Sequence, residues 1–189
     1  MIRAIYQTGF RVLFFASCLF AVTTSSQADE ASDQLNSLFD QLKLATTAEE
    51  ARMIEQRIWD AWNKNDDPDA EARLLRSKES WATGRVVEAI AQLNDMVERY
   101  PEWVTPWNLR ATYQYLLGNF DTSLADVDRV LALEPRHFGA LTGAGGILVQ
   151  QGKLEEALAY YLRALEVYPT MLPIQARVKE LERILGPSV

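Results

Sequence analysis

Residues 104–137 read VTPWNLRATYQYLLGNFDTSLADVDRVLALEPRH, and residues 138–171 read FGALTGAGGILVQQGKLEEALAYYLRALEVYPTM. Each stretch is 34 residues long, and the marks that they share also occur once upstream at the same interval. These marks are Gly84, Gly118 and Gly152, together with Pro101, Pro135 and Pro169. Self-similarity at a fixed period indicates units that each bury an apolar face against the next unit. The sequence therefore predicts three stacked repeats over residues 70–103, 104–137 and 138–171.

The pattern inside each repeat predicts two helices and no strand. From Ser32 onward the apolar residues recur at helical spacing, and the run is broken at regular intervals. Gly118 and Gly152 stand where the first helix of a pair should end, so we expect them to adopt a left-handed conformation. The prolines end the second helix of each pair. The fold class that we predict is all-α.

The consensus residues of the second and third repeats resemble those of the tetratricopeptide repeat (TPR) family. The second repeat carries Trp107, Ala111, Gly118, Phe120, Ser123, Val127 and Pro135, and the third carries Leu141, Gly145, Gly152, Leu154, Ala157, Tyr161, Ala164 and Pro169. The resemblance implies a superhelix of stacked antiparallel helix pairs. Small residues such as Gly145 let two helix backbones approach closely. In the first repeat Arg73, Arg76 and Ser77 occupy consensus positions of the first helix, so its packing is expected to be weaker.

Helical segments flank the repeats on both sides. Residues 29–66 predict an N-terminal helical hairpin, or a decayed repeat, which we expect to cover the first repeat; its second helix begins at Thr47 with a capping box to Glu50. Asp67 and Pro68 suit the start of the next helix. Residues 172–186 predict an amphipathic helix that caps the open end of the stack. Its inner side is expected to carry Ile174, Val178, Leu181 and Leu185.

The first 28 residues read as a secretory signal peptide. Arg3 and Arg11 precede an apolar run over residues 12–22, and small residues stand before a cleavage position after Ala28. The apolar run is shorter than the roughly 20 residues that span a bilayer. We therefore predict export to the periplasm, with an uncleaved anchor or lipidation at Cys18 as the alternatives. Cleavage after Ala28 leaves a mature chain without cysteine, and hence without disulfides.

The charge of the predicted mature chain argues against two classes of partner. The whole chain carries a net charge of −7, and without the leader 17 basic residues face 26 acidic ones, a net charge of −9. A protein that binds nucleic acid needs a basic face. We expect no nucleic-acid partner and no membrane insertion of the mature chain.

No motif in the sequence predicts catalysis, a metal site or a cofactor. His137 is the only histidine, and we interpret it as a polar turn residue between repeats. A calcium loop over residues 65–71 is the sharper alternative for that acidic stretch, but Pro68 stands where such a loop needs glycine. The run 143–146 is rich in glycine but lacks the lysine and hydroxyl residue that end a phosphate loop. We predict that the protein is not an enzyme and holds no cofactor.

In the TPR family the first helices of successive pairs line a concave groove that takes peptides. Carried over to this chain, the resemblance implies a groove lined by Leu74, Lys78, Trp81, Asn108, Thr112, Tyr115, Thr142, Gly146 and Gln150. Some family members grip a C-terminal carboxylate with a set of lysine, asparagine and arginine side chains on this face. Only Lys78 and Asn108 are candidates for that role here, so we do not predict such a clamp.

A strip of glycines lies on one face of the first helix of the third repeat. Gly139, Gly143 and Gly146 are spaced four and three residues apart and would share a helix face. Our hypothesis is that a partner backbone, or a terminal segment of this chain, lies directly on this strip; drift on a tolerant surface is the plainer alternative. The function that we predict is a non-catalytic protein- or peptide-binding adaptor or scaffold. The alternative is a structural envelope protein that self-associates into a homo-oligomer.

Overall fold

A computed structural model describes the chain from Leu19 to Gly186, with side chains from Asp29 onward. The chain divides into two compact units, residues 1–37 and 38–189, which are considered separately. Helix α1 (Leu19–Leu44) runs through the first unit and ends in the second. Most of the predicted signal peptide, with Cys18, lies outside the described residues. From Leu19 to Gly186 no helix is long and apolar enough to cross a bilayer.

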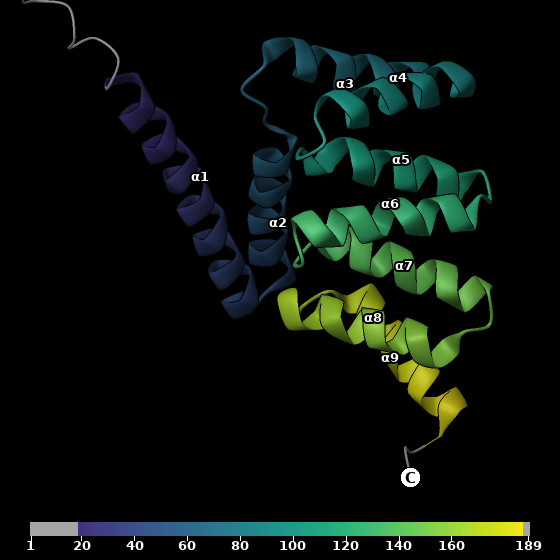
Figure 1. Cartoon of the computed structure of the whole chain (residues 1–189). Helices are drawn as coiled ribbons and strands as arrows, with labels where there is room; N and C mark the ends of the chain where they lie inside the picture. Colours follow the sequence, from purple (N-terminus) through teal and green to yellow (C-terminus); the bar gives the residue numbers. More distant parts are fainter. Residues whose placement is uncertain (1–18, 187–189) are drawn as a thin grey trace, which may run out of the picture. The chain divides into compact units, whose positions relative to one another are not determined.

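The second unit is a succession of short helices, in which α3 to α8 run antiparallel in turn and α2 lies across their direction (Figure 1). After α1 come α2 (Ala48–Asn63), α3 (Pro68–Ala82), α4 (Val86–Arg99), α5 (Val104–Leu116), α6 (Phe120–Leu133), α7 (Phe138–Gln150), α8 (Leu154–Val167) and α9 (Leu172–Leu185). The described part of the chain contains helices and no strand. The helices α3 and α4, α5 and α6, and α7 and α8 pack as pairs. The all-α prediction is confirmed.

The same turn closes the first helix of every pair. Gly84, Gly118 and Gly152 have φ angles of 78°, 78° and 74°, in the left-handed region that glycine adopts without strain. The amide after each glycine donates to a carbonyl five residues upstream, at 2.8 to 2.9 Å. This is the bond pattern of a Schellman cap, which satisfies carbonyls left free at a helix end. The predicted left-handed conformation of these glycines is confirmed.

Two kinds of contact hold the helices of a pair together. In the first repeat Ser77 Oγ donates to the carbonyl of Ala89 at 3.2 Å, and in the second Ser123 Oγ donates to that of Ala111 at 2.7 Å. The third repeat has no such hydroxyl at these positions, and the ring of Tyr161 packs directly on Gly145 instead. A Cβ atom built at Gly145 would clash with that ring. We expected Gly145 to let two helix backbones approach closely, and the structure shows instead that the Tyr161 ring fills the space that a side chain at this position would need.

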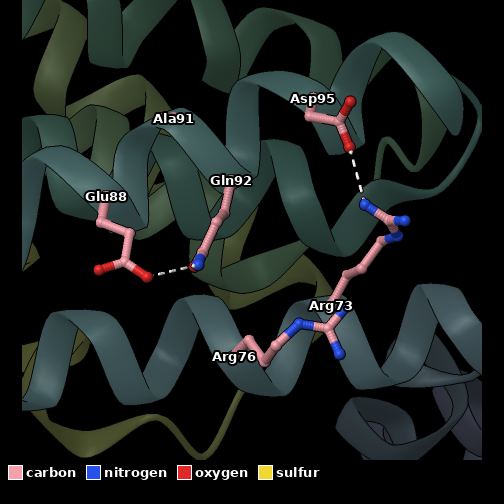
Figure 2. Close-up of a pocket in the computed structure, with 6 residues that line it drawn as sticks. All are labelled: Arg73, Arg76, Glu88, Ala91, Gln92 and Asp95. Atoms are coloured by element: carbon pink, nitrogen blue, oxygen red, sulfur yellow. Dashed lines mark hydrogen bonds and ion pairs between the residues drawn. The ribbon is translucent and has the colours of Figure 1, made fainter.

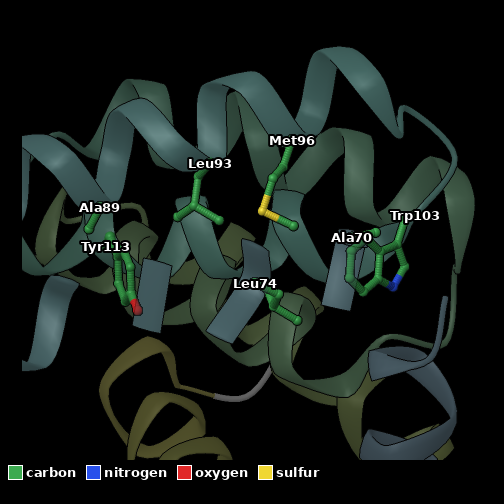
Figure 3. Close-up of a cluster of buried hydrophobic side chains, with 7 residues drawn as sticks. All are labelled: Ala70, Leu74, Ala89, Leu93, Met96, Trp103 and Tyr113. Atoms are coloured by element: carbon green, nitrogen blue, oxygen red, sulfur yellow. The ribbon is translucent and has the colours of Figure 1, made fainter. Parts of the chain in front are cut away.

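Apolar side chains join each pair to the next. Figure 3 shows the cluster at the first repeat, which contains Ala70 and Leu74 of α3, Ala89, Leu93 and Met96 of α4, Trp103 directly before α5, and Tyr113 of α5. At the other end Val178 and Leu181 of α9 join a cluster with Leu148, Ala157 and Tyr161. Two of the four side chains predicted for the inner side of α9 are thus buried, and Ile174 packs partly against them. The last helix covers the apolar face of the third repeat.

The helix starts predicted at Thr47 and Asp67 are both capped as expected. Thr47 Oγ1 accepts from the amide of Glu50 at 3.2 Å, while the Glu50 carboxylate accepts from the amide of Thr46 at 3.1 Å. Asp67 accepts from the amide of Asp69 at 2.9 Å, with Pro68 as the first helical residue. Each bond satisfies an amide that the helix itself leaves without a partner.

The outer face of the first repeat is charged and exposed. Arg73 bonds to Asp69 at 2.6 Å and to Asp95 at 3.2 Å, and Arg76 lies exposed beside it (Figure 2). These arginines stand at consensus positions because the face contacts solvent and not a preceding helix pair. We expected the segment 29–66 to cover this repeat, and the structure places its second helix elsewhere.

Helix α2 lies at the two junctions between the repeats, near residues 103–105 and 137–138. The carbonyl of Trp62 accepts from Trp103 Nε1 at 2.8 Å and from Thr105 Oγ1 at 2.7 Å. About one turn nearer the start of α2, the ring of Trp59 packs against the rings of His137 and Phe138 at the start of α7. Its apolar stripe, Ile54, Ile58 and Trp62, is buried as predicted. These contacts make α2 part of the core of the repeats and not a lid on their first member.

Candidate functional site

The residues predicted to line a groove lie on the first helix of each repeat, α3, α5 and α7. We call the shared face of these three helices the first-helix surface. Two contacts join its parts: Trp81 of α3 stacks on Tyr113 of α5, with ring centroids 3.9 Å apart, and the Tyr115 hydroxyl of α5 lies next to Gly146 of α7. The structure thus brings the three repeats together on one face.

On α3 the three predicted residues differ in accessibility. Leu74 is only 4% exposed and belongs to the cluster of Figure 3, so its side chain is not available to a partner. Lys78 is exposed and makes no ion pair with the described residues. Trp81 is half-buried and held by its stack on Tyr113. An aromatic ring that is already fixed in place loses little rotamer entropy when a partner covers it.

On α5 the predicted residues form a polar row that ends in an aromatic ring. Asn108 is half-buried, and its side-chain amide has no hydrogen-bond partner in the described chain. Thr112 is exposed and donates to the backbone carbonyl of Asn108 at 2.9 Å. Tyr115 is half-buried, and its ring lies 5.9 Å from that of Phe120. This helix supplies hydrogen-bonding groups beside an apolar ring.

On α7 the surface is smooth. Thr142 donates to the carbonyl of Gly139 at 3.1 Å, and Gln150 at the end of the helix is exposed. A Cβ atom at Gly143 would meet nothing within 4 Å, and one at Gly146 would meet only two tyrosine hydroxyls. Two of the three glycines of the strip, Gly143 and Gly146, are therefore not covered by a neighbouring ring.

The other end of the strip is covered by the chain itself. A Cβ atom at Gly139 would lie 3.0 Å from the Trp59 ring and 3.3 Å from that of His137. Our hypothesis placed a partner backbone or a terminal segment of this chain on the strip, whereas at Gly139 the ring of Trp59 from the internal helix α2 covers it. The buried stripe of α2 was visible in the sequence, but its docking place was not, because no local signal pairs residues 59 and 139.

His137 is part of this covered end and differs from our expectation. We interpreted it as a polar turn residue, whereas its side chain is fully buried and stacks on Trp62 with ring centroids 4.0 Å apart. Its Nδ1 accepts from the amide of Ala140 at 3.1 Å and so caps α7. Burial lowers the pKa of His137 to about 3, so the imidazole is neutral at pH 7.

A buried ion pair stiffens the second repeat behind the first-helix surface. Arg110 of α5 donates two hydrogen bonds to Asp126 of α6, at 2.6 and 2.8 Å, and a third to Asn94 of α4 at 2.9 Å. Asp126 is almost fully buried, so the paired geometry is required to hold its charge there. Three helices are fixed to one another by a single guanidinium.

The hollow in Figure 2 is a poorer candidate for a ligand site. It measures about 380 Å³ and is lined by Arg73, Arg76, Glu88, Ala91, Gln92 and Asp95. Its arginines pair with carboxylates of the same repeat, and Gln92 donates to Glu88 at 3.1 Å. Between Asp29 and Gly186 no group of three or more His, Cys, Asp or Glu side chains is placed to hold a metal ion.

Sequence comparisons give one family. A model of the tetratricopeptide repeat matches residues 108–171. A TPR repeat-containing protein of Rhizobium etli is 32% identical over 171 residues, an alignment that covers 87% of this chain and 81% of the relative. DnaJ homolog subfamily C member 3 of Mus musculus is 29% identical over 102 residues, which cover 54% of this chain and 20% of the mouse protein.

Solved structures share the fold. The first TPR of Spaghetti (RPAP3) bound to the HSP90 peptide SRMEEVD has a TM-score of 0.60 at 22% identity, over 65% of this chain and 97% of that one. The Yersinia enterocolitica type III secretion chaperone SycD, in complex with a peptide of the translocator YopD, also has a TM-score of 0.60, at 11% identity. That match covers 65% of this chain and 100% of SycD. At these identities the likeness is one of fold.

Proposed function

We propose that this chain, which belongs to the tetratricopeptide repeat family, is a non-catalytic adaptor that binds a protein or peptide on its first-helix surface. The observation that carries the proposal is the uncovered part of that surface. Lys78, Asn108 and Gln150 point hydrogen-bonding groups there without a partner among the described side chains. Trp81 and Tyr115 stand beside them as half-buried rings. Fixed aromatic anchors flanked by free polar groups are typical of protein interfaces.

Two fold neighbours support peptide binding as a use of this fold. Both the TPR of Spaghetti and the chaperone SycD were solved with a bound peptide. The TPR fold is generally a non-catalytic interaction module, which agrees with a chain that carries no catalytic motif. We infer that the adaptor role extends to this chain.

We also propose that the protein acts after export, in the periplasm. The support is in the sequence: a basic start, an apolar run and small residues before Ala28. Mass spectrometry of the protein from its own cells tests the point. A chain that begins at Asp29 in the periplasmic fraction is expected, and a full-length chain in the cytoplasmic fraction would contradict export.

Crosslinking in cells tests the adaptor function. A photoreactive amino acid replaces Thr112 on the first-helix surface, and in a control protein it replaces Asp128, which is exposed on α6. We expect a discrete crosslinked protein from position 112 that disappears when Trp81 is also changed to alanine. Equal products from both positions, or a product that survives Trp81→Ala, would contradict binding at this surface.

A second candidate is self-association, which the last helix favours. Leu172 and Ile184 of α9 are 62% and 50% exposed, and Leu162 of α8 is 42% exposed. Sedimentation of the purified protein over a range of concentrations separates the candidates. A mass that stays monomeric would contradict self-association and leave the adaptor proposal unaffected.

A further inference from the structure

Two tyrosine hydroxyls meet at the open end of the glycine strip. A Cβ atom built at Gly146 would lie 3.9 Å from the hydroxyl of Tyr161 and 4.0 Å from that of Tyr115. No other atom outside the helix's own backbone would come within 4 Å of it. The two tyrosines come from different repeats, since Tyr115 ends α5 and Tyr161 lies on α8.

Tyr161 is buried except where its hydroxyl reaches this surface. The residue is 4% exposed, and its ring packs on Gly145 one residue before the strip. Its hydroxyl makes no hydrogen bond within the described chain, and neither does that of Tyr115. Tyr100 and Tyr168 differ, because their hydroxyls donate to Asp67 at 2.7 Å and to Glu55 at 3.1 Å. The Tyr161 hydroxyl is not among the buried polar atoms that lack a partner, so it is accessible at this surface and can donate to an acceptor that a partner supplies.

The chemistry of the two hydroxyls defines the group that they would receive. Burial raises the pKa of Tyr161 above its ordinary value, so the phenol stays protonated at neutral pH. A protonated phenol donates one hydrogen bond, which requires an acceptor such as a carbonyl oxygen. Gly146 has no side chain, so a second backbone can approach the helix at this place.

The chain's own α2 shows how the strip is used at its other end. Trp59 covers Gly139, and Gly146 follows seven residues later, about 10 Å further along the helix. Of the two positions, only Gly146 is uncovered by the described residues. Gly139 is thus covered within the fold, whereas Gly146 is accessible to the backbone of a second chain.

We propose that Gly146, Tyr115 and Tyr161 form a site for the backbone of an extended peptide from a partner protein. A peptide carbonyl over Gly146 accepts hydrogen bonds from the two hydroxyls, while the neighbouring side chains contact Trp81 and Thr112. The inference rests on the proposed adaptor function and specifies where and how the partner is held. It assigns backbone recognition to the junction of the second and third repeats, and recognition of the peptide's side chains to Trp81 and Thr112 of the first two repeats.

Peptide selection on the purified protein provides the probe. Random twelve-residue peptides displayed on phage are selected, and the Kd of the best binder is measured by fluorescence polarisation. Tyr161→Phe and Tyr115→Phe remove one hydroxyl each and keep the ring. We expect each change to weaken binding about fivefold, since a net hydrogen bond contributes on the order of 1 kcal/mol. Gly146→Leu should weaken binding more than tenfold, because a side chain fills the place of the peptide backbone.

Two controls separate a binding role from a structural one. Tyr160→Phe removes a tyrosine hydroxyl from the neighbouring position on α8 and should leave the Kd unchanged. The thermal midpoint of Tyr161→Phe should match the parent protein, because its hydroxyl has no bond to lose. A lowered midpoint together with weaker binding would show that the hydroxyl supports the fold and would overturn the proposal.

The remaining outcomes distinguish this inference from the function on which it rests. Binding that is lost in Trp81→Ala but unchanged in Tyr161→Phe and Tyr115→Phe would overturn the backbone site and keep the adaptor proposal. Binding that is insensitive to Trp81→Ala as well would overturn both. Failure to select any binder would also count against both.

Discussion

The two ends of the first-helix surface are built from the same helices and have opposite properties. At the start of α5 and α7, Thr105 and Gly139 lie under α2, and aromatic rings close the contact. Two turns further along, Thr112 is exposed and Gly146 has no covering side chain. The first end is part of the core and the other is surface. Thr105 and Gly139 are equivalent repeat positions, 34 residues apart, and so are Thr112 and Gly146.

The difference shows that repeat positions do not by themselves identify a binding site. A residue at a lining position becomes core as soon as another segment of the chain docks on it. Here α2 covers the first turns of α5 and α7, so on these two helices the part available to a partner is confined to the later turns. Substitutions at the two ends should therefore affect different properties of the protein.

The largest change in the free energy of unfolding is expected for Trp62→Ala at the covered end. Trp62 is 5% exposed, stacks on His137 and contacts Phe39, so its removal leaves a cavity between α2 and the repeats. We expect a loss of about 3–5 kcal/mol in the free energy of unfolding, measured with urea. Thr112→Ala at the open end is the matched control, with a change below about 0.5 kcal/mol. A loss below about 1 kcal/mol for Trp62→Ala would show that α2 is not part of the core.

The glycine strip allows a comparison within one helix. Gly139→Leu places a side chain into the Trp59 ring and should destabilise the fold by about 1–3 kcal/mol. Gly143→Leu meets no neighbour within 4 Å and should stabilise it by about 0.5–1 kcal/mol, since glycine is a poor helix former. Urea unfolding of the two variants measures the difference. If both variants changed the free energy of unfolding in the same direction, the division of the strip into a covered and an uncovered end would be contradicted.

His137 gives the covered end a pH dependence that the open end lacks. Its pKa in the folded protein is about 3, below the ordinary value of 6.5, so the unfolded chain binds the proton first as the pH falls. The contribution of the neutral imidazole is complete above pH 6.5 and declines between pH 6.5 and 3. At pH 5 the protein should be less stable than at pH 7 by about 2 kcal/mol.

The control for this effect is His137→Asn, which keeps a side chain able to cap a helix. Its unfolding free energy should vary less between pH 7 and 5 than that of the parent protein. An equal dependence in both proteins would place the titrating group elsewhere.

A smaller effect is expected where α2 meets the end of the third repeat. Tyr168 donates to Glu55 of α2 at 3.1 Å, and burial together with this carboxylate raises the pKa of Tyr168 to about 12. Tyr168→Phe should lower the thermal midpoint by an amount that corresponds to about 1 kcal/mol. Tyr160→Phe, whose hydroxyl has no bond within the described chain, should leave the midpoint unchanged.

Much of the fold could be predicted because its signals are local and repeated. Gly118 and Gly152 mark a turn that only a left-handed residue makes, and Thr47 with Glu50 marks a helix start; the structure shows all of them. Ser77 was noted as a departure from the consensus, whereas its hydroxyl makes the same kind of bond as Ser123. That equivalence needed the positions of two carbonyls that no sequence pattern gives.

The candidate site was less predictable because it depends on contacts between distant segments. Leu74 stands at a lining position but is directed into the core, and His137 was taken for a turn residue although α2 buries it. The free hydroxyl of Tyr161 could not be found from the sequence, since the consensus explains that tyrosine as a packing residue. Long-range docking decides all three outcomes.

Hydrogen exchange of the amides of α2, followed by mass spectrometry with and without a selected peptide, tests most directly whether α2 is core while the open end binds. We predict that residues 54–62 exchange as slowly as α5 and α7, and that the peptide slows exchange in the later turns of α3, α5 and α7 but not in α2. Rapid exchange of α2, or its release when the peptide binds, would contradict the division of the surface.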